Sequence, residues 1–157
     1  MTLVSPQVHT LHPGHVVCVG TGETMETLLG SCIAVILTDP RRTLGAMCHI
    51  VHASPDNSPA RDGTAHADSA LRRMFALLMA RGVVPRLCEA YVYGGGNMFP
   101  ELGDACSSVG DDNAAWALQA LQDMGVTVLG TDVRGTVYRR LRWTVGPDAP
   151  QVDAVPL

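Results

Sequence analysis

The stretch GSCIAVILTDPRRTLGAMCHIV, residues 30–51, contains two apolar segments separated by turn-forming residues. Ile33 to Leu37 is an unbroken apolar run bounded by turn signals, which is the pattern of a buried β-strand. Asp39 to Arg42 supplies the turn, and Gly45 to Val51 has the pattern of a returning strand. The stretch therefore predicts an antiparallel hairpin with a buried first strand.

Predicted helices and strands are interspersed along the rest of the chain. Apolar residues recur at helical spacing over residues 67–81, and a second helix is predicted over residues 112–124. Further strands are predicted over residues 16–19, 87–93, 126–129 and 138–145. We expect one α/β domain over residues 1–157, a layered sandwich with a mixed or antiparallel sheet and helices packed on the outside. Residues 1–12 and 147–157 are expected to be loose ends.

The composition excludes several classes of function. The 157 residues are 46% hydrophobic, which is enough to bury a core. All 11 basic residues are arginines scattered along a chain of net charge -4, so no basic stripe suits a nucleic acid. No signal-peptide pattern or long apolar run is present, so a cytoplasmic location without membrane insertion is expected. The 5 cysteines lack a CxxC pair, which argues against a zinc knuckle or a disulfide framework.

One cysteine and one histidine of the hairpin are candidates for catalysis. If the turn is centred between Pro40 and Arg41, Cys32 lies directly opposite His49. Facing side chains in such a pair have Cβ atoms about 4.5–5.5 Å apart. An imidazole at that distance could take the proton of the thiol, which makes the thiolate nucleophile.

The turn that precedes Cys32 adds possible anion-binding groups. Gly30 and Ser31 bring the chain tightly into the strand, so backbone N–H groups from Gly30 to Ile33 could hold an oxyanion near the sulfur. A cysteine at the edge of an apolar strand is also often an inert core residue, and this structural alternative stays open.

Three histidines near the N-terminus are an alternative site for a metal ion. His9, His12 and His15 recur at three-residue spacing, but Pro13 and Gly14 interrupt them. No acidic or cysteine residue shares the spacing, so we expect no metal site there.

The hairpin segments resemble the signature of the CheD family of bacterial chemotaxis proteins. LLGSCIAVILTDP (residues 28–40) is similar to a Gly-Ser-Cys turn that opens one strand, and GAMCHI (residues 45–50) to the strand that supplies the base. Further segments resemble the family in the same order: HADSALRRMFALLMARG (66–82), YGGGNMF (93–99), VGDDN (109–113), and TDVRG (131–135) with Arg139.

The resemblance implies a protein-glutamine deamidase that acts on methyl-accepting chemotaxis receptors without a cofactor. It implies Cys32 as the nucleophile and His49 as the base. The family commonly has a catalytic threonine six residues before the cysteine. Glu26 occupies that position here and Thr27 follows it, so both stay candidates for the third catalytic role.

The glycine-rich segment has two interpretations. Gly94, Gly95, Asn97, Met98 and Phe99 resemble a family segment near the active site, and Phe99 matches a residue implicated in engaging partners. Alternatively, the segment is a glycine turn whose Met98 and Phe99 pack into the core. A phosphate-binding loop is disfavoured because the GxGxxG spacing and any lysine are missing.

Two other functions remain open for a chain of this kind. It could be a non-catalytic or weakly catalytic regulator of the CheC phosphatase, with which family members form complexes. It could also hydrolyse receptor glutamyl methyl esters, which is the same acyl chemistry with a different leaving group.

Overall fold

The computed structural model describes residues 7–53, 66–102 and 108–156. A four-stranded sheet has the strand order β1-β3-β8-β9, and a five-stranded sheet the order β2-β5-β4-β6-β7. The first consists of β1 Val8–Thr10, β3 Thr24–Leu29, β8 Val137–Thr144 and β9 Gln151–Pro156. The second consists of β2 Val16–Gly20, β5 Leu44–Ile50, β4 Ile33–Thr38, β6 Glu89–Gly94 and β7 Thr127–Val133.

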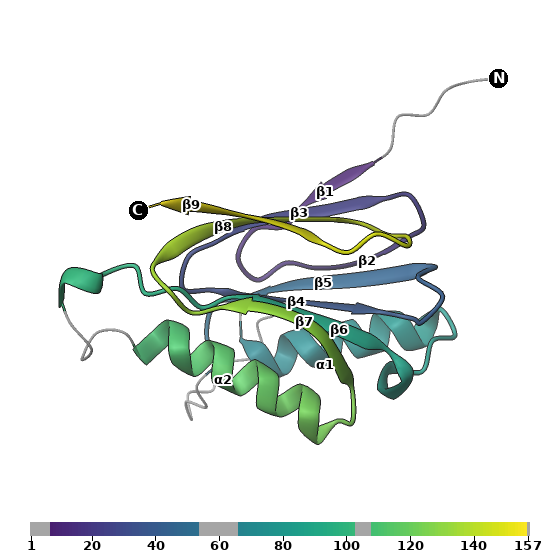
Figure 1. Cartoon of the computed structure of the whole chain (residues 1–157). Coiled ribbons are helices and arrows are strands. Elements are labelled where there is room, and N and C mark those ends of the chain that lie inside the picture. Colours follow the sequence, from purple (N-terminus) through teal and green to yellow (C-terminus); the bar gives the residue numbers. More distant parts are fainter. Residues whose placement is uncertain (1–6, 54–65, 103–107, 157) are drawn as a thin grey trace.

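The described elements stack in three layers. The four-stranded sheet lies on one face of the five-stranded sheet, and helices α1 (Ala67–Ala80) and α2 (Ser108–Asp123) cover the other face (Figure 1). Short 3-10 helices η1 (Pro85–Leu87) and η2 (Pro100–Leu102) lie between these elements. The prediction of a layered α/β sandwich with mixed strand orientation and outer helices is confirmed.

Strand β4 explains the unbroken apolar run of the sequence, because both of its faces are covered. Ile33, Val35 and Leu37 pack into the core under the helices. Ala34 and Ile36 pack into the second core, between the two sheets. A strand buried on both faces needs apolar side chains at every position, so the usual alternation with polar residues is missing.

The predicted hairpin is present, but its register is wrong by two residues. Ala34 pairs with His49, so Cys32 does not lie directly opposite His49. The turn is centred one residue later than expected because the Asp39 carboxylate accepts hydrogen bonds from the backbone N–H groups of Thr43 (2.8 Å) and Leu44 (2.9 Å). A shift of two residues keeps every side chain on its predicted face.

Parts of the two segments expected to be loose ends, residues 8–10 and 151–156, form paired strands, while residues 1–6 and 157 lie outside the described part of the chain. Val8 of β1 pairs in parallel with Thr24 of β3, and β9 pairs antiparallel with β8. Val152 of β9 packs against the core between the sheets. Pro156 is the last residue of β9, an edge strand, where one backbone N–H can be missing.

Strand β3 was not predicted, and helix α2 begins four residues earlier than expected. In β3, Met25 and Leu29 are fully buried, and Thr27 between them lies on the same inward face. The alternation of inward and outward residues in β3 could not be recognised from the sequence, because polar threonines occupy buried positions of the strand. The early start of α2 places Gly110 inside the helix, against the glycine-rich segment.

Candidate active site

Buried His49 is held by a chain of two hydrogen bonds in one orientation and one tautomer. His49 Nδ1 lies 2.7 Å from Thr27 Oγ1, which in turn lies 2.7 Å from the carbonyl oxygen of Leu11. A carbonyl oxygen only accepts, so Thr27 donates its hydroxyl proton to Leu11 and accepts the Nδ1 proton of His49. The other ring nitrogen, Nε2, is therefore unprotonated and can act as a base.

The loop at residues 12–15 packs along the backbone of His49 and makes its charged form unfavourable. The N–H of His49 donates to the His15 carbonyl (3.1 Å), and the N–H of Gly14 donates to the His49 carbonyl (2.9 Å). Burial is the main reason that the pKa of His49 falls to about 4, and electrostatic repulsion from His12 and His15 contributes to the same shift. His49 is therefore neutral at neutral pH.

Cys32 lies just before β4, on the face of the hairpin that carries His49. Ala34, the residue opposite His49, is two positions further along and points the same way. Cys32 is thus a diagonal neighbour of His49. The backbones of diagonal neighbours are about 7–8 Å apart, a distance that a long or aromatic side chain can span. The half-buried thiol packs against the core between the sheets, and burial raises its pKa. The resting pair is a neutral thiol with a neutral imidazole.

The glycine-rich segment holds the turn before Cys32 through backbone contacts. The N–H of Gly96 donates to the carbonyl of Gly30 (3.0 Å), and the N–H of Gly95 donates to the carbonyl of Cys32 (2.9 Å). The approach is so close that a Cβ on Gly94 would overlap the Cys32 carbonyl oxygen. Only glycine fits there, which explains this part of the sequence.

Helix α2 holds the middle of the same turn. The side-chain Nδ2 of Asn113 donates to the carbonyl of Ser31 (3.1 Å). A trans peptide directs each carbonyl and the following N–H to opposite sides. The N–H groups of Ser31 and Cys32 therefore point away from these contacts, and within the described part of the chain they donate to no other group. They are the candidate donors for an oxyanion site next to Cys32.

Ile33 was also expected to contribute to an oxyanion site, and its position in the sheet argues against this. Hydrogen bonds of an antiparallel strand alternate between its two neighbours. Since the Cys32 carbonyl bonds toward β6, the backbone groups of Ile33 face β5, where Ile33 is paired with Ile50. The N–H of Ile33 therefore points toward β5 as part of the sheet and not toward a substrate.

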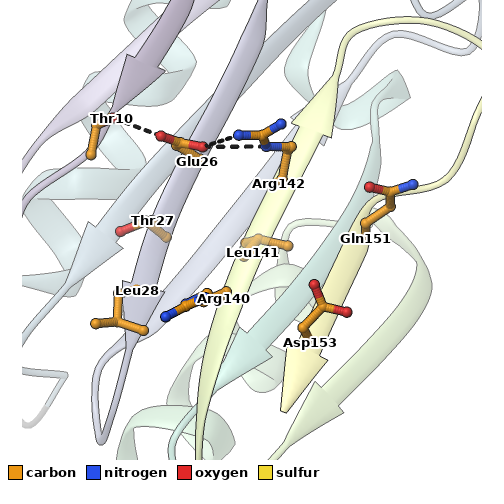
Figure 2. A pocket seen from close by; sticks show the side chains of 9 residues that line it. All are labelled: Thr10, Glu26, Thr27, Leu28, Arg140, Leu141, Arg142, Gln151 and Asp153. Carbon is orange, nitrogen blue, oxygen red and sulfur yellow. Dashed lines mark hydrogen bonds and ion pairs between the residues drawn. The ribbon is translucent and has the colours of Figure 1, made fainter. Parts of the chain in front are cut away.

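Glu26 and Thr27 lie on opposite faces of β3, which separates the two candidates for the third catalytic role. Figure 2 shows Glu26 on the outer face, where it accepts hydrogen bonds from Thr10 (3.0 Å) and Arg142 (2.7 Å). These residues border an open groove of about 410 Å³. The groove is on the far side of β3 from His49.

A smaller hollow of about 230 Å³ adjoins the Cys32 turn. Its lining residues are Ser31, Gly96, Asn97, Met98, Phe99, Val109 and Gly110. Phe99 is 57% exposed and Val109 is 54% exposed, whereas Met98 is half-buried against Gly30. The interpretation of Phe99 as a core residue is therefore wrong, and its ring lies on the surface beside the site.

The three N-terminal histidines do not converge. His9 bonds to Glu23 (3.1 Å), while the rings of His12 and His15 meet edge to face. In residues 7–53, 66–102 and 108–156, no group of three or more potential ligands could hold a metal ion. No helix in those same ranges has the length and apolar character needed to cross a membrane.

Two buried polar residues of the site were given no role from the sequence. Arg139 is 3% exposed and donates to Asp132 (3.1 Å) and to the Arg134 carbonyl (2.6 Å), next to the glycine-rich segment. Asn113 is 2% exposed. A usable signal for Asn113 existed, because it lies four residues before Ala117 on the buried stripe of α2, where an amide must have a specific partner.

Comparison with known proteins places this chain in a family. A family model described as CheD chemotactic sensory transduction matches residues 52–147. The chain belongs to the CheD family. CheD relatives named probable chemoreceptor glutamine deamidases include one from Geobacter sulfurreducens, 35% identical over 87% of this chain and 82% of that protein. Another, from Agrobacterium fabrum, is 30% identical over 96% of this chain and 82% of that protein.

The span of these CheD matches bears on the site. The family model begins after Cys32 and His49, but the Agrobacterium fabrum alignment covers both positions. Among solved structures, a Neisseria meningitidis protein of the DUF152 family has a TM-score of 0.45 and 15% identity, over 83% of this chain and 64% of that one. That likeness is too weak to support an argument.

Proposed function

We propose that this CheD-family chain deamidates glutamine side chains of chemotaxis receptors through a thioester on Cys32. The observation that carries the proposal is the hydrogen bond between Thr27 and His49. That bond leaves Nε2 of His49 unprotonated, and His49 lies on the same face of the hairpin as Cys32. The names of the relatives supply the substrate class.

The first half of the reaction forms the thioester. Sulfur of Cys32 attacks the carboxamide carbon while Nε2 of His49 takes the thiol proton. The N–H groups of Ser31 and Cys32 hold the developing oxyanion. When the tetrahedral intermediate collapses, the C–N bond breaks and the His49 Nε2 proton passes to the leaving nitrogen, which departs as ammonia.

The second half restores the enzyme. A water molecule loses a proton to Nε2 of His49 and attacks the thioester carbon. The C–S bond then breaks, the proton returns to the sulfur of Cys32, and a glutamate side chain remains on the receptor. Thr27 keeps the Nδ1 proton in place throughout, and every group used belongs to the protein.

The surface beside the site supports a docking role for the glycine-rich segment. Gly94 and Gly95 shape the wall next to Cys32, and Asn97 holds the turn because its Oδ1 accepts the backbone N–H of Phe99 (2.9 Å). Met98 and Phe99 then present an apolar edge. We propose that a receptor helix packs on this edge when its glutamine enters the site.

The deciding experiment is intact-mass measurement of a receptor cytoplasmic fragment after incubation with the protein. Conversion of amide to acid adds about 1 Da per site, and we expect it with the wild type but not with Cys32→Ala. Cys18→Ala, which removes another half-buried thiol, is the matched control and should retain activity.

The other outcomes assign the alternatives. Loss of a methyl group from methylated receptor, again only with Cys32 present, would show esterase activity. An unchanged mass with wild type, together with binding to a CheC phosphatase that Cys32→Ala retains, would favour the regulatory role and overturn the deamidase proposal.

A further inference from the structure

The side chain of Asn113 makes three hydrogen bonds, and together they join both halves of the active site. Its Nδ2 donates to the carbonyls of Ser31 (3.1 Å) and Val51 (3.2 Å), and its Oδ1 accepts from the backbone N–H of Ala53 (3.0 Å). Ser31 directly precedes Cys32, and Val51 comes two residues after His49. One amide thus links the nucleophile turn to the end of the strand that carries the base.

The chemistry of this position requires an amide. Two carbonyl oxygens need donors and one N–H group needs an acceptor, and a carboxamide supplies both at the ends of one short side chain. A carboxylate at the same place would direct its negative charge at two carbonyl oxygens. An apolar side chain of similar size would leave all three backbone groups without these partners, in a setting that is buried at Ala53 and part-buried at Ser31 and Val51.

The helix that carries Asn113 is itself fixed against the site. A Cβ on Gly110 would lie 2.5 Å from the Gly95 carbonyl oxygen and 2.6 Å from that of Gly96. The first turns of α2 therefore touch the glycine-rich segment through Gly110 and the Cys32 turn through Asn113. This contact leaves Asn113 little freedom to move.

We propose that Asn113 is a positioning residue for the deamidation reaction, which sets the separation of the Cys32 sulfur from Nε2 of His49 and the direction of the Ser31 and Cys32 N–H groups. The inference rests on the proposed function. It goes further by assigning the geometry of the pair to a side chain on α2 that touches neither the substrate nor the reacting atoms.

The test uses Asn113→Asp, which keeps the size of the side chain and changes donors to acceptors. We expect kcat to fall by about 100-fold and KM to stay within about twofold, because a misplacement on the order of 1 Å costs about that much rate. Gln119→Glu is the control, since it makes the same chemical change at an exposed position of the same helix, where the amide bonds to Asp123. It should leave both constants unchanged.

A second measurement separates positioning from loss of structure. The rate of Cys32 alkylation by iodoacetamide, read from the modified peptide, is compared in the wild type, Asn113→Asp, His49→Gln and the double variant. If Asn113 acts through the Cys32–His49 geometry, the double variant should react at nearly the rate of His49→Gln alone. If the two substitutions instead change the alkylation rate independently, so that their separate fold-changes multiply in the double variant, the proposal is overturned. An unchanged kcat in folded Asn113→Asp would also overturn it.

Two precautions keep the outcomes distinct. If Asn113→Asp does not fold, Asn113→Ser serves in its place, because a hydroxyl can still donate to one of the two carbonyls. Alkylation needs no receptor, so it reports on Asn113 even if the wild type proves inactive. A wild type without activity would contradict the proposed function. Independent effects of the two substitutions on the alkylation rate would contradict only the role of Asn113.

Discussion

Thr27 determines which nitrogen of His49 carries the proton. It accepts from Nδ1 because its own proton is donated to the Leu11 carbonyl. Without the hydroxyl, the buried ring can adopt the other tautomer, in which Nε2 carries a proton and cannot act as the base.

Thr27→Val, which keeps the shape of the side chain, should therefore lower kcat by about 100-fold, the lower range for general-base catalysis. Thr27→Ser retains the hydroxyl and should keep most of the activity. Steady-state kinetics on a receptor fragment would measure both. Glu26→Gln, on the opposite face of β3, is the control; a loss of activity there equal to that of Thr27→Val would contradict the assignment.

The sequence proposed Cys32 and His49 as the candidate pair, but it could not choose between Glu26 and Thr27 for the third role. The two residues are adjacent, and only the alternation of a strand decides which of them faces inward. Since β3 was not recognised as a strand, that information was missing. Asn113 was missed for a different reason, because its partners are backbone carbonyls more than 60 positions away in the chain.

At the scale of elements, the central hairpin was predicted on the correct faces and in the wrong register. Hydrophobic pattern fixes the face of each residue, and an error of two leaves that pattern intact. The register depends on the turn, where the Asp39 carboxylate binds two backbone N–H groups and Arg42 takes a left-handed conformation with φ 56°. The spacing of apolar residues carries no information about such hydrogen bonds in a turn, so it could not predict the register.

The segment between β6 and η2 gives a prediction for receptor binding. Phe99→Ala should raise KM for a receptor fragment by about tenfold, which corresponds to about 1.4 kcal/mol of binding free energy, and should leave kcat nearly unchanged. Its side chain is exposed and lies beside the hollow, not in the turn that holds Cys32.

Leu87→Ala is the matched control for Phe99→Ala. Leu87 is 62% exposed and belongs to η1, away from the hollow that adjoins the Cys32 turn. Kinetics over a range of receptor-fragment concentrations would show whether the two variants differ. Equal effects on KM would mean that Phe99 has no special place in docking.

At the scale of the whole molecule, the layered architecture followed from the order of helices and strands. The sequence did not show which strands belong to which sheet. The four-stranded sheet is assembled from β1, β3, β8 and β9, three of which had no recognisable pattern. Its central pairing, between β3 and β8, joins residues far apart in the chain, such as Thr24 and Thr144. Such long-range contacts leave no local signal in the sequence.

The buried histidine makes the stability of the fold depend on pH. The pKa of His49 falls from an ordinary value of 6.5 to about 4 on folding, so between these values the unfolded chain binds more protons. The free energy of unfolding should therefore decrease as the pH falls from 6.5 to 4, by on the order of 3 kcal/mol at most from this group.

Urea unfolding of wild type and His49→Gln at pH 7.5 and pH 4.5 would measure this dependence. Carboxyl groups titrate in both proteins, so the relevant quantity is the difference between them. We expect the wild type to lose more stability than the variant on acidification. Equal losses would show that His49 accepts a proton in the folded protein without cost.

The backbone wall beside Cys32 has a consequence for how such proteins diverge. Gly94 and Gly95 meet the turn before Cys32 through main-chain atoms, and their positions have no room for a side chain. Selection for a new target cannot easily reshape that wall, because every replacement there displaces Cys32. Changes in target preference must instead accumulate on the rim, at exposed positions such as Phe99 and Val109. In a lineage with several copies of this protein, the residues of the rim should therefore differ between copies with different targets, while the glycines of the wall should be the same in all of them.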